Sequence, residues 1–195
     1  MSPDFVAAPS STDFTIRPVE PSEYDALARI TLEAYEGNRD DLGDAYREEL
    51  RDVGGRAAAC PVLVAVAPDG GLLGGVAYVP GPGNAMSELE RDGEAGIRML
   101  AVDPDAQGLG VGRALTVACL DRAREDGRSG IALYTRPANL PAQRLYASLG
   151  FIRDPDRDWE VEPGHWLWAF QSRSGSRMNP RDAYRRCAGM LAGRV

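Results

Sequence analysis

The sequence IRMLAVDPDAQGLGVGRA occupies residues 97–114 and carries the strongest structural signal in the chain. It begins as an apolar segment, turns at Pro104, and then places Gly108, Gly110 and Gly112 at alternate positions directly before a helical pattern. Glycines at these positions remove side chains where backbone N–H groups must point into one small volume. The helix adds four unpaired N–H groups and the positive end of its dipole. The stretch therefore predicts a strand, a glycine-rich turn and a helix N-terminus that together bind an anion, above all a phosphate or pyrophosphate.

Three phosphate-binding devices share this layout, and the spacing of residues separates them. A P-loop needs Lys-Ser/Thr after its last glycine, where this chain has Arg113 and Ala114. A dinucleotide fingerprint needs glycines at i, i+2 and i+5, and here Gly108 and Gly110 fit but the third position is Arg113. What remains is Gln-Gly-x-Gly-x-Gly-Arg-Ala after a strand that ends Leu-Ala-Val-Asp-Pro. This pattern resembles the acetyl-CoA-binding motif of the GCN5-related N-acetyltransferase (GNAT) family; the alternative is a tight glycine turn with no ligand.

The composition is that of one globular domain, with room for a small appendage. The chain has 195 residues, of which 44% are hydrophobic and 26% charged. It contains no run of about eighteen apolar residues, which a membrane-spanning helix needs. Its first residues, Met-Ser-Pro-Asp, lack the basic and apolar regions of a signal peptide. We therefore expect a cytoplasmic protein that does not enter the membrane.

The cysteines and the histidine argue against a metal site. Cys60, Cys119 and Cys187 are far apart in the sequence, odd in number and without metal-ligand spacing. They are typical of reduced, mostly buried thiols. His165 is the only histidine, so a zinc site or a histidine-based catalytic triad is not expected.

The charge is unevenly distributed. Residues 172–195 carry six arginines and one acidic residue, a net charge of +5. Because the whole chain has a net charge of −7, residues 1–171 have a net charge of −12. An acidic body does not favour nucleic acid as a partner, but it would attract a cationic amine.

Hydrophobic periodicity predicts the order of helices and strands. Expected strands cover residues 14–17, 62–66, 72–79, 95–102 and 130–135, a strand that starts at 151, and 165–170. Expected helices cover residues 22–36, 42–53, 111–126 and 139–149. Strands come first, and helices and strands then alternate, which favours a mixed sheet with helices on its faces. We expect an α/β (α+β) GNAT-like acyl-CoA N-acyltransferase fold, with a mixed, mostly antiparallel central sheet of six to seven strands and helices on both faces.

A second motif strengthens the resemblance. Asn139, Leu145-Tyr146 and Gly150-Phe151 reproduce the family's Asn…Leu-Tyr-x-x-x-Gly-Phe signature. Asn139 and Tyr146 are seven positions apart, so they share one helix face. The resemblance implies that Asn139 binds the pantetheine arm and that Tyr146 lies by the thioester sulfur, where a phenol can donate a proton to the departing thiolate. The alternative is a tyrosine packed in the core beside an N-cap asparagine.

The resemblance covers about residues 14–170 and implies an enzyme. Its acyl donor would be acetyl-CoA, and the acceptor a primary amine of a small molecule or peptide that attacks directly in a ternary complex. Backbone N–H groups near Leu100 and Val102 would hold the pantetheine and polarise the carbonyl. The expected cofactor-binding residues are Leu100, Ala101, Val102, Gln107, Gly108, Leu109, Gly110, Val111, Gly112, Arg113, Ala114, Asn139 and Tyr146.

The amine has a pKa near 10 and must lose a proton, so a general base or a wet path to solvent is needed. Some family members carry a glutamate six residues before the strand-end valine, where this chain has Gly96. Acetyltransferases of the ribosomal-protein type carry one on the next strand, where this chain has Tyr134. Glu94 shares the strand face of Gly96 and is the candidate base, beside Tyr146 as the candidate acid. A solvated loop acid is the alternative for Glu94.

Other substrate contacts and the domain organisation are predicted with less detail. Tyr35, Asp40, Asp41 and Asp44 are candidate substrate contacts, with solvated surface as the alternative. We expect a disordered lead-in at residues 1–13, a GNAT domain at 14–171, and a basic tail at 172–195. In that tail we expect a helix at 179–192 that packs on the body or supports a homodimer.

Two other classes of protein stay open at this point. The same fold can bind acyl-CoA without chemistry, as a regulatory protein. A nucleotide-binding or phosphate-transfer domain could use the glycine turn differently, although the lysine, Walker aspartate and ribose-binding acid of such domains are missing.

Overall fold

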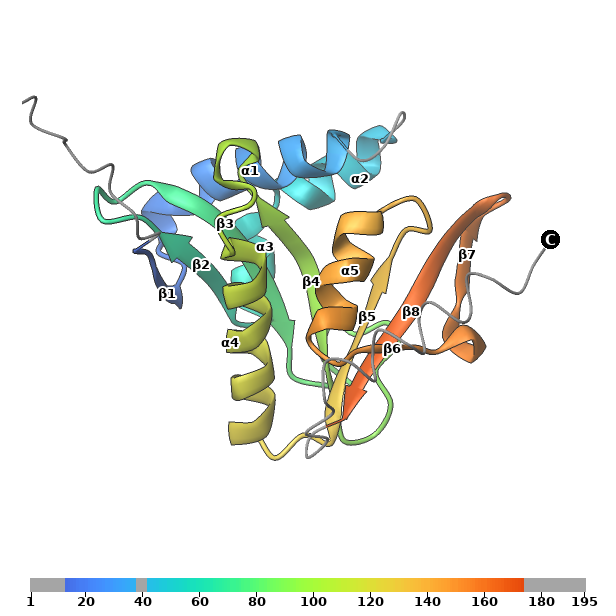
Figure 1. Ribbon diagram of the computed structural model, residues 1–195. Coiled ribbons are helices and arrows are strands. Elements are labelled where there is room, and N and C mark those ends of the chain that lie inside the picture. Colours follow the sequence, from blue (N-terminus) through green and yellow to red (C-terminus); the bar gives the residue numbers. More distant parts are fainter. Residues whose placement is uncertain (1–12, 38–41, 174–195) are drawn as a thin grey trace, which may run out of the picture.

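The computed structural model describes residues 13–37 and 42–173. Within these residues the chain alternates between short strands and helices around one central sheet (Figure 1). The strands are β1 Thr15–Pro18, β2 Val62–Val66, β3 Leu72–Val79, β4 Glu94–Val102, β5 Gly130–Thr135, β6 Ile152–Arg153, β7 Trp159–Glu162 and β8 His165–Arg173. The helices are α1 Tyr24–Glu36, α2 Asp44–Arg51, α3 Val53–Ala59, α4 Val111–Glu125 and α5 Leu140–Ser148, with 3₁₀ turns η1 Pro21–Glu23, η2 Pro104–Ala106 and η3 Pro155–Arg157.

The eight strands form one mixed sheet. Their order is β1-β2-β3-β4-β5-β8-β6, and β7 pairs with β8 beside this path. Only the β4–β5 pair in the described sheet is parallel. The predicted mixed, mostly antiparallel sheet is confirmed, with one strand more than the expected six to seven. The additional strand is β7: its Trp-Glu-Val-Glu alternation is a strand signal, but four residues are too few to separate a strand from a loop.

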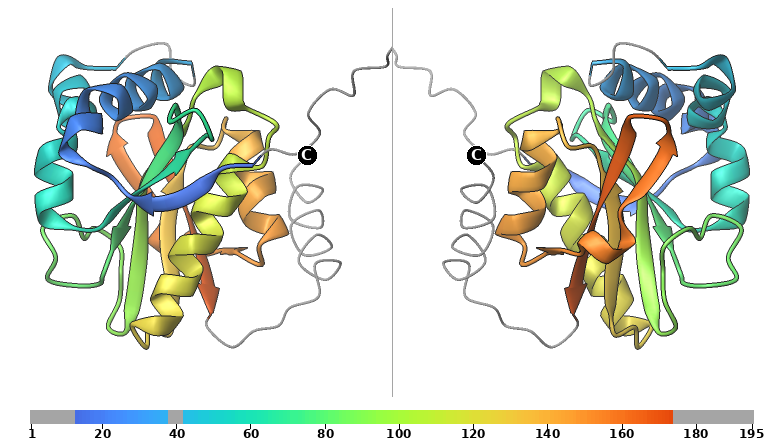
Figure 2. Two further views of the ribbon diagram at one scale, coloured as in Figure 1. Left: turned by 90° about the vertical axis from the view of Figure 1, so that its left-hand side faces the viewer. Right: turned by 90° about the vertical axis from the view of Figure 1, so that its right-hand side faces the viewer.

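Helices cover both faces of the sheet, as predicted. Figure 2 shows the sheet edge-on, with α1, α2 and α3 on one side and α4 and α5 on the other. The core beneath α1 and α3 is formed by Leu27, Val53, Cys60, Val62, Val64, Val66 and Ala77. The core beneath α4 and α5 includes Val76, Ile97, Val111, Leu115, Cys119, Leu133, Tyr146, Phe151 and Phe170. The sheet is therefore buried on both faces along β2 to β5.

A bulge in β4 changes which side chains face each core. The β3–β4 pairing shifts register, and Met99 at the shift has a φ of +50°, in the left-handed region. Before the bulge, Ala95 and Ile97 belong to the core under α4 and α5; after it, Leu100 and Val102 pack against that same core. Because the bulge inserts one residue, even-numbered positions after it face the core that odd-numbered positions face before it.

β4 and β5 diverge beyond the bulge. Their parallel pairing ends at Ile97 and Leu133, whereas β4 continues to Val102. Residues 98–102 of β4 therefore have no strand partner on the β5 side. We call this region the β4–β5 divergence; it widens toward the end of β4, with α5 lying across it (Figure 1).

The helix predicted for residues 42–53 is two helices. α2 ends at Arg51, and α3 begins after Asp52, whose side chain accepts a hydrogen bond from the Gly55 N–H at 2.7 Å. α3 has the sequence Val-Gly-Gly-Arg-Ala-Ala-Ala, and two glycines weaken any helix signal in a sequence window. Packing of Val53 and Ala57 against the neighbouring core stabilises this helix instead.

The ends of the predicted domain are partly covered by the structure. β8 continues to Arg173, past the expected boundary at residue 171. The expected lead-in up to residue 12, Asp40, Asp41 and the predicted helix at 179–192 lie outside the described residues, so that helix and the homodimer stay predictions. In the parts of the chain that are described, no helix has both the length and the apolar character needed to cross a membrane.

Candidate active site

The glycine turn leaves the start of α4 open. Gly108 and Gly110 have φ values of +81° and +83°, and a Cβ added to either would meet no atom within 4 Å. α4 begins at Val111 without a side-chain cap, and its first backbone hydrogen bond runs from the Ala114 N–H to the Gly110 oxygen at 3.0 Å. The N–H groups before Ala114 have no helical acceptor, so this end of the helix has the donors and the dipole to bind an anion.

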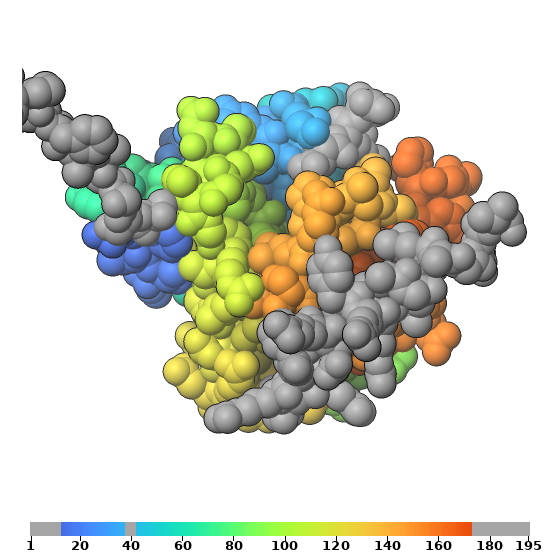
Figure 3. All heavy atoms as spheres, in the orientation of Figure 1, coloured from blue at the N-terminus to red at the C-terminus, as the bar shows by residue number. Residues whose placement is uncertain are grey.

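The turn, the end of β4 and the second half of α5 meet at one place. A Cβ added to Gly112 would lie 3.5 Å from both Val102 Cγ2 and Leu145 Cδ2. The exposed Arg113 donates a hydrogen bond to Ser148 Oγ at 3.2 Å, across the face where α4 and α5 lie side by side (Figure 3). The predicted binding residues 100–102 and 107–114 are thus brought to one end of the β4–β5 divergence.

The strand contributes main-chain groups to this place. Alternate N–H and C=O groups of Leu100, Ala101 and Val102 point to the side where β5 would continue a ladder. Because β5 is absent there, these groups are available to an extended ligand that carries amides or a carbonyl. The arrangement suits a chain-like molecule with an anionic group at the helix end.

Tyr146 is packed as a core residue but keeps a free hydroxyl. Its ring centroid lies 5.5 Å from that of Phe151 and 6.3 Å from that of Phe170, and only 5% of the residue is exposed. Within the described residues its hydroxyl has no hydrogen-bond partner. Burial, and secondarily Cys119, raises the pKa of this hydroxyl, so it carries its proton at neutral pH.

Asn139 is the N-cap of α5. Its Oδ1 accepts a hydrogen bond from the Ala142 N–H at 3.2 Å, which leaves the amide NH₂ group as the part that can bind a ligand. The core tyrosine and N-cap asparagine of the alternative interpretation are therefore both present. The structure places them beside the divergence and does not by itself assign them a ligand.

Tyr35 approaches the same region from the opposite face. Its ring packs edge-to-face against that of Tyr46, with the two ring centroids 6.2 Å apart. Burial raises the pKa of Tyr35, Tyr46 and Tyr146 raise it further, and Arg98 and Arg56 lower it. Tyr35 also packs against the buried cluster that contains Met99, the residue at the β4 bulge. Tyr35 is thus the sequence-predicted acceptor contact that the structure brings close to the other candidates.

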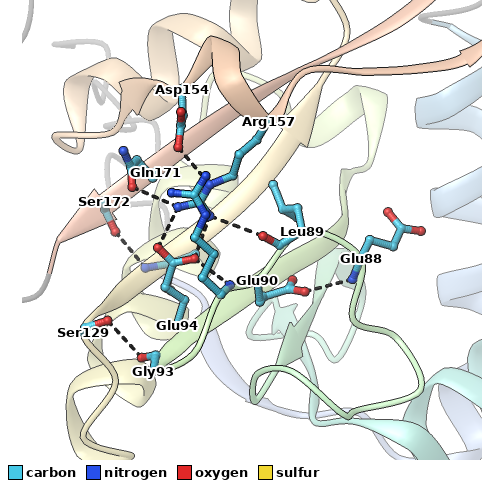
Figure 4. A network of polar contacts seen from close by, with 12 residues as sticks. Glu88, Leu89, Glu90, Gly93, Glu94, Ser129, Asp154, Arg157, Gln171 and Ser172 are labelled. Carbon is cyan, nitrogen blue, oxygen red and sulfur yellow. Dashed lines mark hydrogen bonds and ion pairs between the residues drawn. The ribbon is translucent and has the colours of Figure 1, made fainter.

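Glu94 lies away from these residues, at the other end of β4. Its carboxylate accepts two hydrogen bonds from Arg157, at 2.6 and 2.9 Å, and the two side chains form a largely buried ion pair (Figure 4). Burial alone would raise the pKa of Glu94, but the hydrogen bonds from Arg157 and the Arg91 N–H outweigh burial and hold this pKa below its usual range. Glu94 and Val102 are eight positions apart at opposite ends of β4, roughly 25 Å. These contacts do not favour a role as base.

Glu90 is a second carboxylate near the Glu94 end of β4. The sequence analysis did not predict a role for it. Only 9% of the residue is exposed, and its side chain lies against Gly96 of β4. A glycine within a strand often marks the close approach of another group, so Gly96 was the signal that could have identified this contact.

No group of three or more His, Cys, Asp or Glu residues in the described ranges has an arrangement suited to a metal ion.

Comparisons with known proteins identify relatives of this chain. The sequence model of the acetyltransferase (GNAT) family matches residues 24–151. A mycothiol acetyltransferase from Sanguibacter keddieii is 34% identical over 155 residues, which are 75% of this chain and 46% of that protein. Another, from Thermomonospora curvata, is 49% identical over 57 residues, which are 29% of this chain and 19% of that protein. The matches thus span less than half the length of these curated relatives.

Solved structures share the fold. An acetyltransferase of the GNAT family from Staphylococcus aureus Mu50 aligns with a TM-score of 0.66 and 14% identity, over 83% of this chain and 99% of that one. YncA from Salmonella typhimurium, solved with its cofactor acetyl-CoA, aligns with a TM-score of 0.60 and 23% identity, over 86% of this chain and 98% of that one. At these identities the likeness concerns the fold alone.

Proposed function

We propose that this chain, which belongs to the GNAT acetyltransferase family, transfers the acetyl group of acetyl-CoA to a primary amine. The observation that carries this proposal is the open glycine turn at the start of α4, beside residues 98–102 of β4, which pair with β3 but have no partner on the β5 side. An anion site next to a free strand edge suits a ligand with a pyrophosphate at one end and an amide-containing arm at the other.

The residues present fit acetyl-CoA in three ways. Gly108 and Gly110 leave room for a pyrophosphate against the main chain, and the exposed Arg113 adds a positive charge at its edge. Main-chain groups of Leu100 and Val102 would bind the pantetheine arm, together with the Asn139 amide. The full set of proposed binding residues is Leu100, Ala101, Val102, Gln107, Gly108, Leu109, Gly110, Val111, Gly112, Arg113, Ala114, Asn139 and Tyr146.

The chemistry assigned to the chain is proton transfer and polarisation. Acetyl-CoA supplies the reactive thioester. N–H groups of the diverging strand would polarise its carbonyl as an amine attacks, and Tyr146 would give its proton to the departing thiolate. The raised pKa of Tyr146 keeps that proton in place at neutral pH until a thiolate forms.

The acceptor would be a small-molecule or peptide amine. The curated relatives are named mycothiol acetyltransferases, which makes an acetyl-free form of mycothiol a specific acceptor to test. Tyr35 is a candidate contact of this acceptor, and the −12 charge of residues 1–171 favours approach of a cationic amine.

The test is transfer of radiolabelled acetyl groups from acetyl-CoA by the full chain. Acceptors are acetyl-free mycothiol, polyamines, aminoglycosides, amino acids and short peptides. We expect labelled product from at least one of them. Binding of acetyl-CoA in calorimetry without transfer to any acceptor would instead identify a non-catalytic acyl-CoA-binding protein, and a thermal shift with ATP or NAD in place of acetyl-CoA would contradict the proposal altogether.

A further inference from the structure

We propose that the carboxylate of Glu90 accepts the proton that the acceptor amine must lose, a role that rests on the proposed acetyl transfer. Glu90 lies in the segment between β3 and β4, which crosses the sheet on the face opposite α4 and α5. Leu89 fixes this segment by packing against Ala132, Tyr134 and Ala169 of the neighbouring strands.

Gly96 makes the room that this carboxylate occupies. Ala95 and Ile97 pack into the core under α4 and α5, so strand alternation directs position 96 to the other face. A Cβ added to Gly96 would lie 1.7 Å from Glu90 Oε1 and 2.7 Å from its carboxyl carbon. A carboxylate carried by the loop therefore stands where a side chain of the strand would stand.

The two carboxylate oxygens of Glu90 differ in their contacts. Oε2 accepts hydrogen bonds from the Ser87 hydroxyl at 2.6 Å and from the Glu88 N–H at 2.9 Å, which fixes the carboxylate. Oε1 is buried and has no hydrogen-bond partner within residues 13–37 and 42–173. A buried acceptor atom without a donor is unfavourable, and the N–H of an incoming ammonium would supply that donor.

The segment is also held from outside. Arg157 donates a hydrogen bond to the Leu89 oxygen at 3.3 Å while it pairs with Glu94 (Figure 4). Asn84 Nδ2 bonds the Ala59 oxygen at 2.8 Å, and its Oδ1 accepts from the Met86 N–H. Glu94, predicted as the base, thus helps to position the loop that carries the proposed one.

Glu90 differs from the neighbouring acidic residues Glu88 and Glu94 in its ion pairing. Glu88 pairs with Arg98, and Glu94 pairs with Arg157, whereas in the described part of the chain no arginine forms an ion pair with Glu90. Tyr134 faces the same group from β5: burial raises its pKa, Glu88 and Glu90 raise it further, and Arg157 lowers it.

Glu90 also lies close to the start of the divergence. Gly96 pairs with Ala132 one position before the last paired residues, Ile97 and Leu133. The residue that Glu90 contacts, Gly96, is thus two positions before the part of β4 that has no partner on the β5 side.

The proposed step balances as follows in protons and bonds. The ammonium of the acceptor gives one proton to Glu90, and the freed lone pair forms the C–N bond with the acetyl carbon. The C–S bond breaks, and the thiolate takes the proton of Tyr146. The nitrogen loses its second proton to solvent, and solvent exchange returns Tyr146 and Glu90 to their starting states. The net products are the amide, free CoA and one proton.

The experiment compares Glu90→Gln with the full wild-type chain. Acetyl-CoA affinity should stay within about twofold, because the glycine turn is untouched. Turnover at pH 7 should fall about a hundredfold or more. The loss should shrink as pH approaches the pKa of the amine, near 10, since the solution then supplies the neutral amine. Asp92→Asn, an exposed change in the same segment, is the control and should leave turnover and pH profile unchanged.

A relocation experiment guards against a merely structural effect. Glu90→Ala should lower turnover as Glu90→Gln does, and Gly96→Glu added to Glu90→Ala should restore at least a tenth of it, because the strand then carries the carboxylate into the vacated volume. Gly96→Glu alone should fail to improve on the wild type, since its Cβ collides with the native carboxylate.

The outcomes separate this inference from the proposed function. If the wild type acetylates no amine, the proposed function fails. If it does so and Glu90→Gln keeps the wild-type rate, or loses activity equally at every pH, the role of Glu90 is wrong and acetyl transfer stands. If circular dichroism shows that Glu90→Gln does not fold, the comparison of Glu90→Ala with and without Gly96→Glu becomes the test. Failure of Gly96→Glu to restore activity to a folded Glu90→Ala protein would overturn the proposal.

Discussion

The two ends of β4 are built from different chemistry. At the Val102 end, main-chain groups lack a strand partner on the β5 side, and the glycines of the neighbouring turn leave open space. At the Glu94 end, the carboxylate is closed in by Arg157, with side-chain exposures of 13% and 7%. The open end uses backbone groups that any residue carries, whereas the closed end uses charged side chains that satisfy each other. The charged groups of the closed end neutralise each other, whereas the open end keeps free groups that a ligand can bind.

The clearest way to break this comparison is to fill the open end. Gly110→Asp places a side chain and a negative charge where nothing lies within 4 Å, and we expect acetyl-CoA affinity to fall at least about a hundredfold by like-charge repulsion. Calorimetric titration measures this. Gly70→Asp is the matched control, because Gly70 has a similar φ of +89° and equally open space but lies in the β2–β3 hairpin. Equal losses in both variants would contradict the assignment of the anion site.

The closed end should respond in stability and not in binding. Arg157→Met leaves the buried carboxylates of Glu94 and Asp154 without their partner, so we expect the free energy of unfolding to fall by about 3–5 kcal/mol. Chemical denaturation measures the change. Arg124→Met, which removes an exposed ion pair with Asp121, should have little effect. If the two variants are equally stable, the network does not hold this end of the sheet together.

A sharper version concerns Tyr146, which belongs to the core and to the open end at once. Tyr146→Phe keeps the ring between Phe151 and Phe170, so acetyl-CoA affinity should be unchanged, while turnover should fall about ten- to a thousandfold if the hydroxyl protonates the thiolate. Steady-state kinetics provide the measurement. Tyr78→Phe is the control, since it removes a buried hydroxyl bonded to Asp126, remote from the divergence. Unchanged turnover of Tyr146→Phe would make this residue purely structural.

The smallest effect expected is on the pH dependence of stability. The folded pKa of Glu94 is lowered, so its stabilisation is complete above the unfolded value of about 4.3 and is lost as pH falls through the folded value. Glu94→Gln should therefore lose less stability than the wild type between pH 6 and pH 3. Parallel stability curves for the two proteins over this range would contradict the lowered pKa.

The backbone geometry of the open end could be predicted from the sequence because it depends on local pattern. Gly108 and Gly110 stand where the main chain turns left-handed, directly before the start of α4. The same holds for α5, where Asn139 at the cap and Tyr146 two turns later follow from helical spacing. Local chemistry and local structure coincide there.

The closed end and the acceptor side could not be predicted in this way. Arg157 meets Glu94 across 63 residues of sequence, and no periodicity connects them. The Glu90–Gly96 contact is close in sequence, but it arises from a loop that folds back over the sheet, and its only local signal is a missing side chain. The boundary between α2 and α3 was missed for a related reason, because tertiary packing overrides the weak helix propensity of Gly54 and Gly55.

The bulge at Met99 carries a thermodynamic consequence for the protein without ligand. A methionine in the left-handed region costs on the order of 1–3 kcal/mol, and the protein keeps it at the register shift of the buried β3–β4 pair. A regular β4 would be free of this strain, but its outer edge could then align with β5 and seal the sheet by itself. The strained bulge thus lowers the stability of the free protein, but it keeps the end of β4 separate from β5. A ligand can then bind there without first breaking hydrogen bonds between the two strands.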